Sequence, residues 1–178
     1  MRSFSVQDLT KMAVCVAIIC IASYLSFPIP FTTVPFTCQT LAMLLVALIL
    51  TPKQTFIVML VYILIGSIGL PVFAGGASGA ASLVSPSGGY LWGFLVAYPV
   101  SSMVKGQQIN FWRYFWAGIL SIPIVYAFGI AMICIVLDMN VYEAFLIGAL
   151  PFIPTGIVKV AASSYIAVHL NKVLLRNR

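Results

Sequence analysis

Long apolar runs, interrupted by short polar or irregular segments, dominate the chain. No charged residue occurs between Lys11 and Lys53 or between Lys53 and Lys105, and each interval can hold two membrane-spanning segments of about 20 residues. The pattern predicts six apolar helices that span a membrane, over residues 6–26, 37–51, 54–68, 88–104, 114–137 and 144–172. We therefore expect an all-α membrane protein that forms a single integral membrane domain over residues 1–178.

Composition supports this class. Of the 178 residues, 62% are hydrophobic and only 7% are charged, which is outside the range of soluble domains with a polar surface. Because the same composition continues to the end of the chain, the first apolar run is not simply a removable signal. The lipid bilayer is therefore an expected partner.

The basic residues are placed unevenly, and their placement explains the net charge of +6 without nucleic acid as a partner. Eight of the nine lie at the chain ends or in the even-numbered connections, and the odd-numbered connections contain no Lys or Arg. The positive-inside rule then predicts a multi-pass protein of the cell membrane with both termini in the cytoplasm. The eight are Arg2, Lys11, Lys53, Lys105, Arg113, Lys172, Arg176 and Arg178.

Three irregular segments are predicted to lie on the outer side: the proline-rich run 27–37, the glycine-rich stretch 69–94 and the turn at Asp138. The run FPIPFTTVPFT (27–37) has three prolines, which forbid a regular helix and favour an apolar lid. The stretch GLPVFAGGASGAASLVSPSGGYLWGF (69–94) holds seven of the thirteen glycines and no charge. Irregular backbone at membrane depth is tolerated only where protein covers it or where it lines a cavity. This stretch therefore predicts one wall of a ligand pocket.

Lys159 is the basic residue that does not fit the loops. Pro151 and Pro154 predict an irregular entry to the last segment and a regular helix only from about Thr155, which we expect to be its N-cap. A charge inside such a span costs about 2.5 to 3.5 kcal/mol, so Lys159 needs an anion or a water-filled cavity. A helix N-terminus beside it would add positive charge and favour a carboxylate or phosphate. The alternative is a lysine that snorkels to the outer headgroups.

Polar and aromatic side chains of the irregular segments complete the predicted site. A cation with amide and hydroxyl groups and aromatic walls suits a small amphipathic acid. The candidates are Lys159, Thr33, Thr37, Gln39, Ser78, Phe73, Tyr90 and Trp92.

Other candidate chemistry is weak. The run GGASGAAS lacks the Lys-Ser/Thr of a phosphate loop, and His169 has no second histidine or carboxylate at ligand spacing. The four cysteines suit small buried side chains rather than a metal or disulfide framework. Asp8, Asp138 and Glu143 are the only carboxylates. We expect no catalytic residues, no metal site, no cofactor and no enzymatic activity.

The first predicted helix carries small residues four apart, Ala13 and Ala17, on one face. This spacing lets another transmembrane helix approach closely. The neighbouring helix can belong to the same protein or to a partner.

Three segments resemble a known family. PIPFTTVPFTCQTL (28–41), GLPVFAGG (69–76) and PSGGYLWGF (86–94) are similar to the signature segments of BioY, the biotin-binding substrate component (S component) of energy-coupling factor (ECF) transporters. PFIPTGIVK (151–159) is a looser match, and the resemblance covers most of the chain.

The resemblance implies a six-helix protein that captures biotin from outside and works with a transmembrane coupling protein and two cytoplasmic ATPases. It implies that Ala13 and Ala17 dock the coupling protein and that Lys159 contacts the biotin carboxylate or another polar group. Gly75 matches a position near the ligand where some members carry Asn. One departure is Gly156, which stands where many members have an acidic residue.

Three alternatives remain at this point. The chain could be the substrate component for a different vitamin, a membrane enzyme that acts on lipid, or a structural membrane subunit without a ligand.

Overall fold

Helices make up most of the described chain. The computed structural model describes residues 4–27 and 34–176. Its α-helices are α1 (Val6–Tyr24), α2 (Gln39–Ile49), α3 (Pro52–Ser67), α4 (Gly88–Lys105), α5 (Phe111–Leu137), α6 (Val141–Gly148) and α7 (Ile153–Arg176). Three short 3-10 helices are η1 (Ala74–Gly76), η2 (Ala80–Val84) and η3 (Leu150–Phe152), and two short strands are β1 (Ser26–Phe27) and β2 (Phe36–Thr37).

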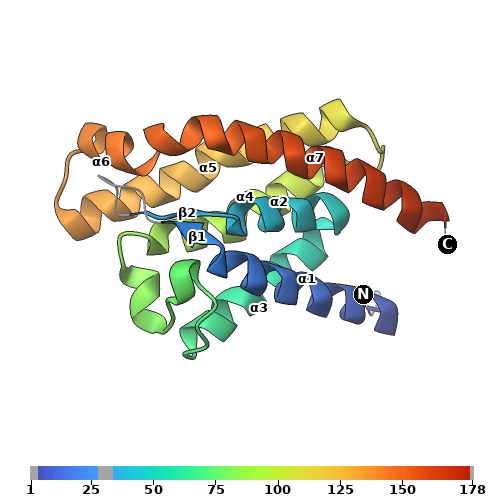
Figure 1. Cartoon of the computed structure of the whole chain (residues 1–178), viewed down its shortest axis with the longest axis horizontal. Helices are drawn as coiled ribbons and strands as arrows, with labels where there is room; N and C mark the ends of the chain where they lie inside the picture. Colours follow the sequence, from blue (N-terminus) through green and yellow to red (C-terminus); the bar gives the residue numbers. More distant parts are fainter. Residues whose placement is uncertain (1–3, 28–33, 177–178) are drawn as a thin grey trace.

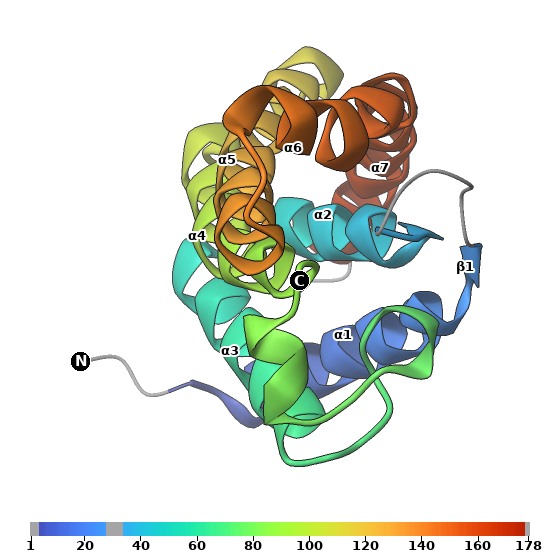
Figure 2. The ribbon, with the colours of Figure 1, turned by 90° about the vertical axis from the view of Figure 1, so that its left-hand side faces the viewer.

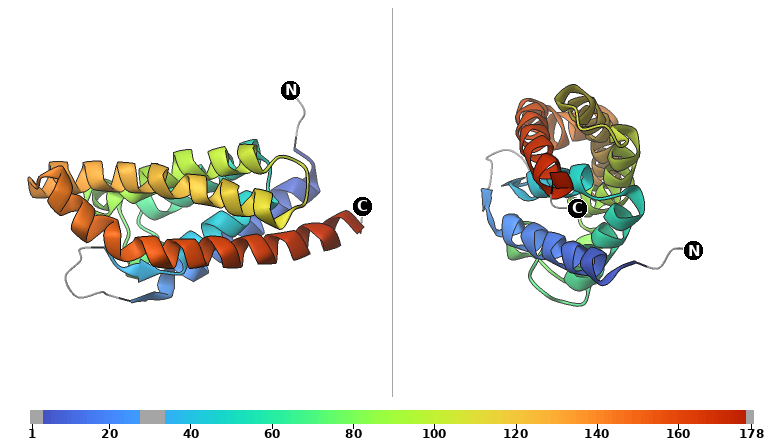
Figure 3. Two further views of the ribbon diagram at one scale, coloured as in Figure 1. Left: turned by 90° about the horizontal axis from the view of Figure 1, so that it is seen from above. Right: turned by 90° about the vertical axis from the view of Figure 1, so that its right-hand side faces the viewer.

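The six longer helices pack as a ring. Around it, α1 contacts α2 and α3, α3 contacts α4, α4 contacts α5, α5 contacts α7, and α7 returns to α2, which also contacts α4. The long helices α5 and α7 run nearly the length of the molecule (Figures 1 and 3). Figure 2 shows that α2, α4, α5 and α7 surround one region and that α1 and α3 lie to one side of it.

The two ends of this helical assembly differ. The start of α1 and the end of α7 lie at the right-hand end in Figure 1, where α2 also passes into α3. The strands, α6 and the connection between α3 and α4, which we call segment 69–87, lie toward the opposite end. The described parts of the irregular segments therefore lie together at one end of the fold, as the sequence predicts.

Three helical stretches of the described chain are long and apolar enough to cross a membrane: Val6–Tyr24, Phe111–Leu137 and Val141–Leu174. Gln39–Ile49 and Pro52–Ser67 are shorter apolar helices. The mostly helical fold agrees with the expected class, and the count of six membrane crossings stays a prediction.

Two helices begin earlier than the apolar pattern predicts because polar residues cap them. Thr51 and Gln54 form a reciprocal capping box, so α3 begins at Pro52 rather than at residue 54. Pro52 is tolerated there because the first N–H groups of a helix have no partner within it. The Asn110 side chain accepts a hydrogen bond from the Trp112 backbone N–H at 2.9 Å, and α5 begins at Phe111 rather than at residue 114.

The last predicted span is two helices, and the expected cap is wrong. The chain turns at Ala149 and passes through η3 before α7 begins at Ile153. Thr155 lies within the first turn of α7, where its hydroxyl donates to the Phe152 carbonyl at 3.0 Å. Pro154 fits in this first turn, where a missing N–H breaks no helical bond. The prolines therefore mark the break before α7 but do not delay its start to Thr155.

A small strand pair, which the all-helical expectation did not include, flanks the proline-rich run. β1 and β2 are antiparallel, with Ser26 opposite Thr37 and Phe27 opposite Phe36. The pair brings the end of α1 to the start of α2. Most of the expected lid, residues 28–33, lies outside the described residues. The candidate site residue Thr33 belongs to this range.

Glycines let α4 and α5 pack closely. A Cβ atom at Gly89 would overlap the Phe128 carbonyl, and one at Gly93 would lie 3.0 Å from the Val125 Cα. On the facing helix, a Cβ atom at Gly129 would overlap the Tyr90 ring. Small residues of this kind allow the backbones of two apolar helices to approach each other.

Side chains from α4 and α7 cap the C-terminus of the short helix α2. The Lys105 ammonium donates to the carbonyls of Ala47 at 2.8 Å and Leu50 at 2.6 Å. Ser102 donates to the same Leu50 carbonyl at 2.6 Å, and Asn171 donates to the Leu48 carbonyl at 2.9 Å. The last carbonyls of a helix lack partners within it, and a cation there also complements the helix dipole. The sequence predicts Lys105 as a loop residue at the membrane exit. In the structure its side chain is only 6% exposed, and its ammonium is bonded to the end of α2.

Candidate ligand-binding site

A cavity of about 330 Å³ lies among β2, α2, segment 69–87, α4, α5, η3 and α7. This volume falls in the range of about 300 to 1,000 Å³ that is typical of small-molecule sites. Its wall includes Phe73, Ala74, Ala77, Ser82, Ser85 and Ser87 of segment 69–87, followed by Tyr90, Leu91 and Phe94 of α4. The glycine-rich stretch therefore forms one wall of a pocket, as the sequence predicts.

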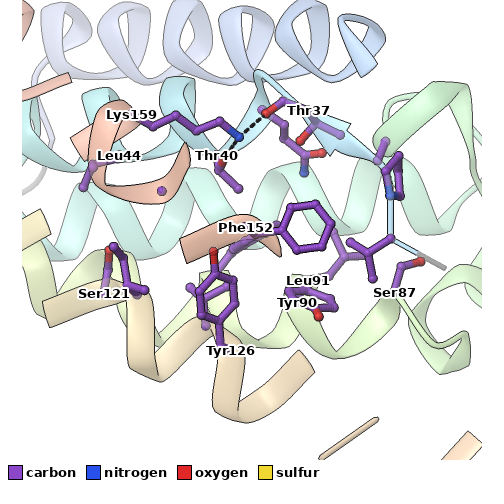
Figure 4. A pocket seen from close by; sticks show the side chains of 18 of the residues that line it. Thr37, Thr40, Leu44, Ser87, Tyr90, Leu91, Ser121, Tyr126, Phe152 and Lys159 are labelled. Atoms are coloured by element: carbon purple, nitrogen blue, oxygen red, sulfur yellow. Dashed lines mark hydrogen bonds between the residues drawn. The ribbon is translucent and has the colours of Figure 1, made fainter. Parts of the chain in front are cut away.

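Lys159 lines this pocket and is the only charged residue among the described residues that line it. Its ammonium donates to the Thr37 carbonyl at 2.6 Å and to the Thr40 hydroxyl at 2.9 Å. It also lies 4.1 Å from the centroid of the Phe36 ring, a cation–π distance. Figure 4 shows Lys159 on one side of the pocket, and Tyr90 and Tyr126 on the other. An ammonium has three donors, so one remains for a ligand.

The helix N-terminus adds less positive charge near Lys159 than the sequence predicts. Because α7 begins at Ile153, Lys159 is six residues further along, roughly 9 Å at the rise of an α-helix. The field of a helix terminus falls off within the first turn. The positive charge of the site therefore comes from the Lys159 ammonium itself.

Aromatic side chains form the apolar walls. Phe73 is held in the pocket because its ring packs where a Cβ atom at Gly66 would lie. The Tyr90 hydroxyl donates to the Gly148 carbonyl at 2.7 Å, so Tyr90 offers its ring rather than its hydroxyl to the cavity. The Phe152 ring of η3 is a further part of the apolar wall.

Gln39 lines the pocket from the first turn of α2, and its side-chain amide is bonded to Tyr62, which lies outside the cavity. Its side-chain Nε2 donates to the Tyr62 hydroxyl at 2.9 Å, and Tyr62 donates to the Val72 carbonyl at 2.8 Å. Thr37 also lines the pocket, and both residues come from the predicted set.

Tyr126 and Thr40 line the pocket although the sequence did not single them out. A Cβ atom at Gly156 would lie 3.4 Å from the Tyr126 hydroxyl, so that hydroxyl projects toward the bare backbone of α7. No described residue forms a hydrogen bond with it, which leaves it for a ligand or for water. A lone tyrosine within an apolar run is the available sequence signal, and it does not distinguish a pocket from packing.

Three predicted site residues do not line the pocket. Gly75 has a φ of 69° and faces Ser26, from which a Cβ atom would lie 3.3 Å. The Ser78 carbonyl accepts from Ser82 at 2.9 Å within segment 69–87. Trp92 is 39% exposed and donates to the Leu83 carbonyl at 3.2 Å, so it lies on the outside of α4.

Ala13 and Ala17 lie on the exposed face of α1. The buried face of the same helix is formed by Met12, Cys15, Ile19 and Ser23. The pair therefore does not serve the internal packing of α1 in this structure, and its role in docking stays a prediction.

Comparisons with known proteins agree with this arrangement. The sequence pattern of the BioY family matches residues 1–176. The "Biotin transporter BioY" of Thermotoga maritima is 32% identical over 166 residues, which cover 93% of this chain and 96% of that protein. The "Probable biotin transporter BioY" of Pyrococcus horikoshii is 32% identical over 164 residues, which cover 92% of this chain and 96% of that protein.

Solved structures show the same fold. The crystal structure of an S-component for biotin from an ECF-type ABC transporter superposes with a TM-score of 0.86 at 27% identity, and the match covers 96% of this chain and 95% of that one. The S component of a bacterial ECF transporter shares the fold with a TM-score of 0.58 at 18% identity, over 96% of each chain. With nearly the whole chain matched in sequence and in structure, this protein belongs to the BioY family.

Proposed function

We propose that this protein is the biotin-binding, substrate-specificity component of an ECF-type uptake transporter, without enzymatic activity of its own. Membership of the BioY family and the biotin transporters among its relatives support this function. The solved S-component for biotin, which matches over nearly the whole chain, supports the same assignment.

The observation that carries the proposal is the Lys159 ammonium, the one charged group among the described residues that line this aromatic pocket. Biotin has a carboxylate at the end of an aliphatic chain and a compact bicyclic ring that bears a ureido group. The remaining donor of Lys159 is matched to the carboxylate, and a charge-assisted hydrogen bond of this kind is about twice as strong as a neutral one. The rings of Phe73, Tyr90 and Phe152 are matched to the apolar faces of the bicycle.

The membrane arrangement is part of the proposal. All six longer helices cross the cell membrane, both termini lie in the cytoplasm, and the pocket faces the outer side. The distribution of Lys and Arg supports this orientation, because the basic ends of the helices lie together at the end opposite segment 69–87. A protease-accessibility or cysteine-labelling assay at the two ends of the chain tests it.

Delivery of biotin to the cytoplasm requires partners in this proposal. A transmembrane coupling protein and two cytoplasmic ATPases assemble with the chain, and Ala13 and Ala17 form part of the docking surface on α1. Their exposure and their spacing of four residues support close approach of a partner helix.

The direct test is calorimetric titration of the purified protein with biotin, thiamine and riboflavin. We expect saturable binding of biotin and none of the other two vitamins. Binding of thiamine or riboflavin in place of biotin would indicate a component for another vitamin. Absence of any ligand would indicate a structural subunit, and turnover of a lipid without the ATPases would indicate an enzyme.

A further inference from the structure

Tyr62 lies behind the pocket, on α3, and is fully buried at 0% exposure. Its ring packs edge-on against Phe73, with ring centroids 5.7 Å apart and an interplanar angle of 71°. Its hydroxyl bridges two elements that line the pocket, since it meets Gln39 of α2 and the Val72 carbonyl at the start of segment 69–87. Tyr62 itself is not among the lining residues.

The hydrogen-bond partners of Tyr62 determine the orientation of the Gln39 side-chain amide. A phenol has one proton, and the Val72 carbonyl can only accept, so the proton of Tyr62 is directed to Val72. The Tyr62 oxygen must therefore accept from Gln39, which turns the NH₂ group of the amide toward Tyr62. In a protein, the placement of amide oxygen and nitrogen follows from such a network. Here the network permits one orientation.

This orientation leaves the Gln39 Oε1 atom for the pocket. Gln39 is 2% exposed and lines the cavity, and Oε1 accepts no hydrogen bond from the described residues. An acceptor that a ligand cuts off from water without a new hydrogen bond costs about 1 to 3 kcal/mol, and a ligand N–H that bonds Oε1 avoids this cost. Lys159, in contrast, offers only donors. The pocket thus presents a donor at one position and an acceptor at another.

We propose that Tyr62 is a positioning residue that fixes the Gln39 Oε1 atom toward the pocket as an acceptor for a ureido N–H of the ligand. Its hydroxyl also ties this acceptor to segment 69–87 through the Val72 carbonyl. The proposal rests on biotin binding as stated above. Without the Tyr62 hydroxyl, the Gln39 amide is free to rotate and to present either its oxygen or its NH₂ group.

The substitution Tyr62→Phe removes one oxygen atom and keeps the buried ring. We expect the affinity for biotin to fall about 3- to 12-fold, the value of one lost hydrogen bond. A loss of this size alone would also fit a structural role. The distinguishing readout is therefore the preference for biotin over its two cyclic carbamate analogues, in each of which a ring oxygen replaces one ureido N–H.

In the unmodified protein, the carbamate oxygen of one analogue would face the Gln39 Oε1 atom, and two acceptors cannot bond. We expect that analogue to bind at least about 100-fold more weakly than biotin, because the pocket acceptor is left unpaired. In Tyr62→Phe the amide can turn its NH₂ group to the carbamate oxygen. The preference for biotin should then shrink by about tenfold or more.

Tyr114→Phe is the matched control. Tyr114 is a buried tyrosine whose hydroxyl accepts from the Asn171 side-chain amide at 2.9 Å, at the other end of α7 from the pocket. Its loss should leave the preference for biotin unchanged. Gln39→Met, which removes the acceptor and keeps the length of the side chain, should lower the preference as Tyr62→Phe does, and the double variant should lower it no further.

The outcomes separate the two proposals. Failure of the unmodified protein to bind biotin would overturn the proposed function and this inference with it. Biotin binding with an undiminished preference in Tyr62→Phe would overturn this inference alone. If Tyr62→Phe does not fold, an undiminished preference in Gln39→Met would overturn it as well.

Discussion

The Tyr126 hydroxyl lies 3.4 Å from the position that a Cβ atom at Gly156 would occupy, and both residues line the pocket. Tyr126 belongs to α5 and Gly156 to α7, so these two residues lie where the two helices meet in the wall of the cavity. The hydroxyl therefore places a polar group beside a position of α7 that has no side chain. The departure noted at Gly156 removes a carboxylate but does not leave this wall without a polar group.

Tyr126→Phe should weaken biotin binding about 3- to 12-fold, the value of one neutral hydrogen bond, with little change in thermal stability. Calorimetry and a melting curve on the same preparation measure both quantities. Tyr90→Phe is the comparison, because the Tyr90 hydroxyl is bonded to the Gly148 carbonyl and its loss should lower stability more than affinity. Unaltered affinity in Tyr126→Phe would mean that water rather than ligand occupies that site.

Lys159→Ala should weaken biotin binding by about 1.5 to 3 kcal/mol, the value of a hydrogen bond to a charged group. The neutral primary amide of biotin should lose less affinity than the free acid, because it has no carboxylate to pair with the ammonium. Lys53→Ala is a suitable control, since Lys53 is exposed at the start of α3. An unchanged affinity of Lys159→Ala for biotin would show that this lysine serves the packing of Thr37 and Thr40 and does not bind the carboxylate.

Two glycines should respond in opposite ways to alanine. At Gly156 the new Cβ atom meets ordinary contacts of 3.4 and 3.5 Å, so Gly156→Ala should be tolerated and gain up to about 1 kcal/mol from helix propensity. At Gly89 it would overlap the Phe128 carbonyl, so Gly89→Ala should cost about 1 to 3 kcal/mol through strain between α4 and α5. Melting temperatures without ligand measure the difference, and equal shifts would argue against the close α4–α5 packing.

Ala13→Trp or Ala17→Trp should leave biotin binding intact and disrupt assembly with the coupling protein. Both residues are exposed on α1, so a larger side chain there does not reach the pocket but blocks close approach of a partner helix. Co-purification with the coupling protein and ATPases is the measurement. Val158→Trp on α7, where Val158 is 68% exposed, provides a control at another exposed apolar position. Normal assembly of the α1 variants would count against the docking role.

Lys105→Met should lower thermal stability and leave biotin affinity nearly unchanged. The substitution leaves the Ala47 carbonyl without its Lys105 donor, and each buried polar group left unpaired costs about 1 to 3 kcal/mol. Lys172→Met, at an exposed position of α7, is the control. Equal melting temperatures for the two variants would show that the Lys105 bonds do not stabilise the fold.

The sequence predicts best what local patterns determine. Apolar length located the helices, and an isolated charge within an apolar run located Lys159 in the pocket. The helix starts at Pro52 and Phe111 were missed because capping depends on individual hydrogen bonds rather than on hydropathy. The prediction of Thr155 as an N-cap is wrong because proline breaks a helix only beyond its first turn, and Pro154 lies within the first turn of α7.

The parts of the site that were missed depend on contacts between distant segments. Tyr126 gains its place opposite Gly156 only when α5 packs against α7. The orientation of Gln39 depends on Tyr62, which is 23 residues away in the chain. Trp92, in turn, is on the outside of α4 because the buried face of that helix carries Tyr90, Leu91 and Phe94. No local pattern contains this information.

The capped end of α2 affects how the pocket can respond to a ligand. α2 has 11 residues, a length of roughly 16 Å at the helical rise, with Thr40 in its first turn and the carbonyls of Ala47 and Leu48 in its last. Short helices usually fray at their ends, and fraying would absorb a displacement at the other end. The last carbonyls of α2 are bonded to Lys105 of α4 and Asn171 of α7, and the Thr40 hydroxyl in its first turn accepts from Lys159 of α7. A ligand that bonds Lys159 therefore meets a helix that is fastened near both of its ends.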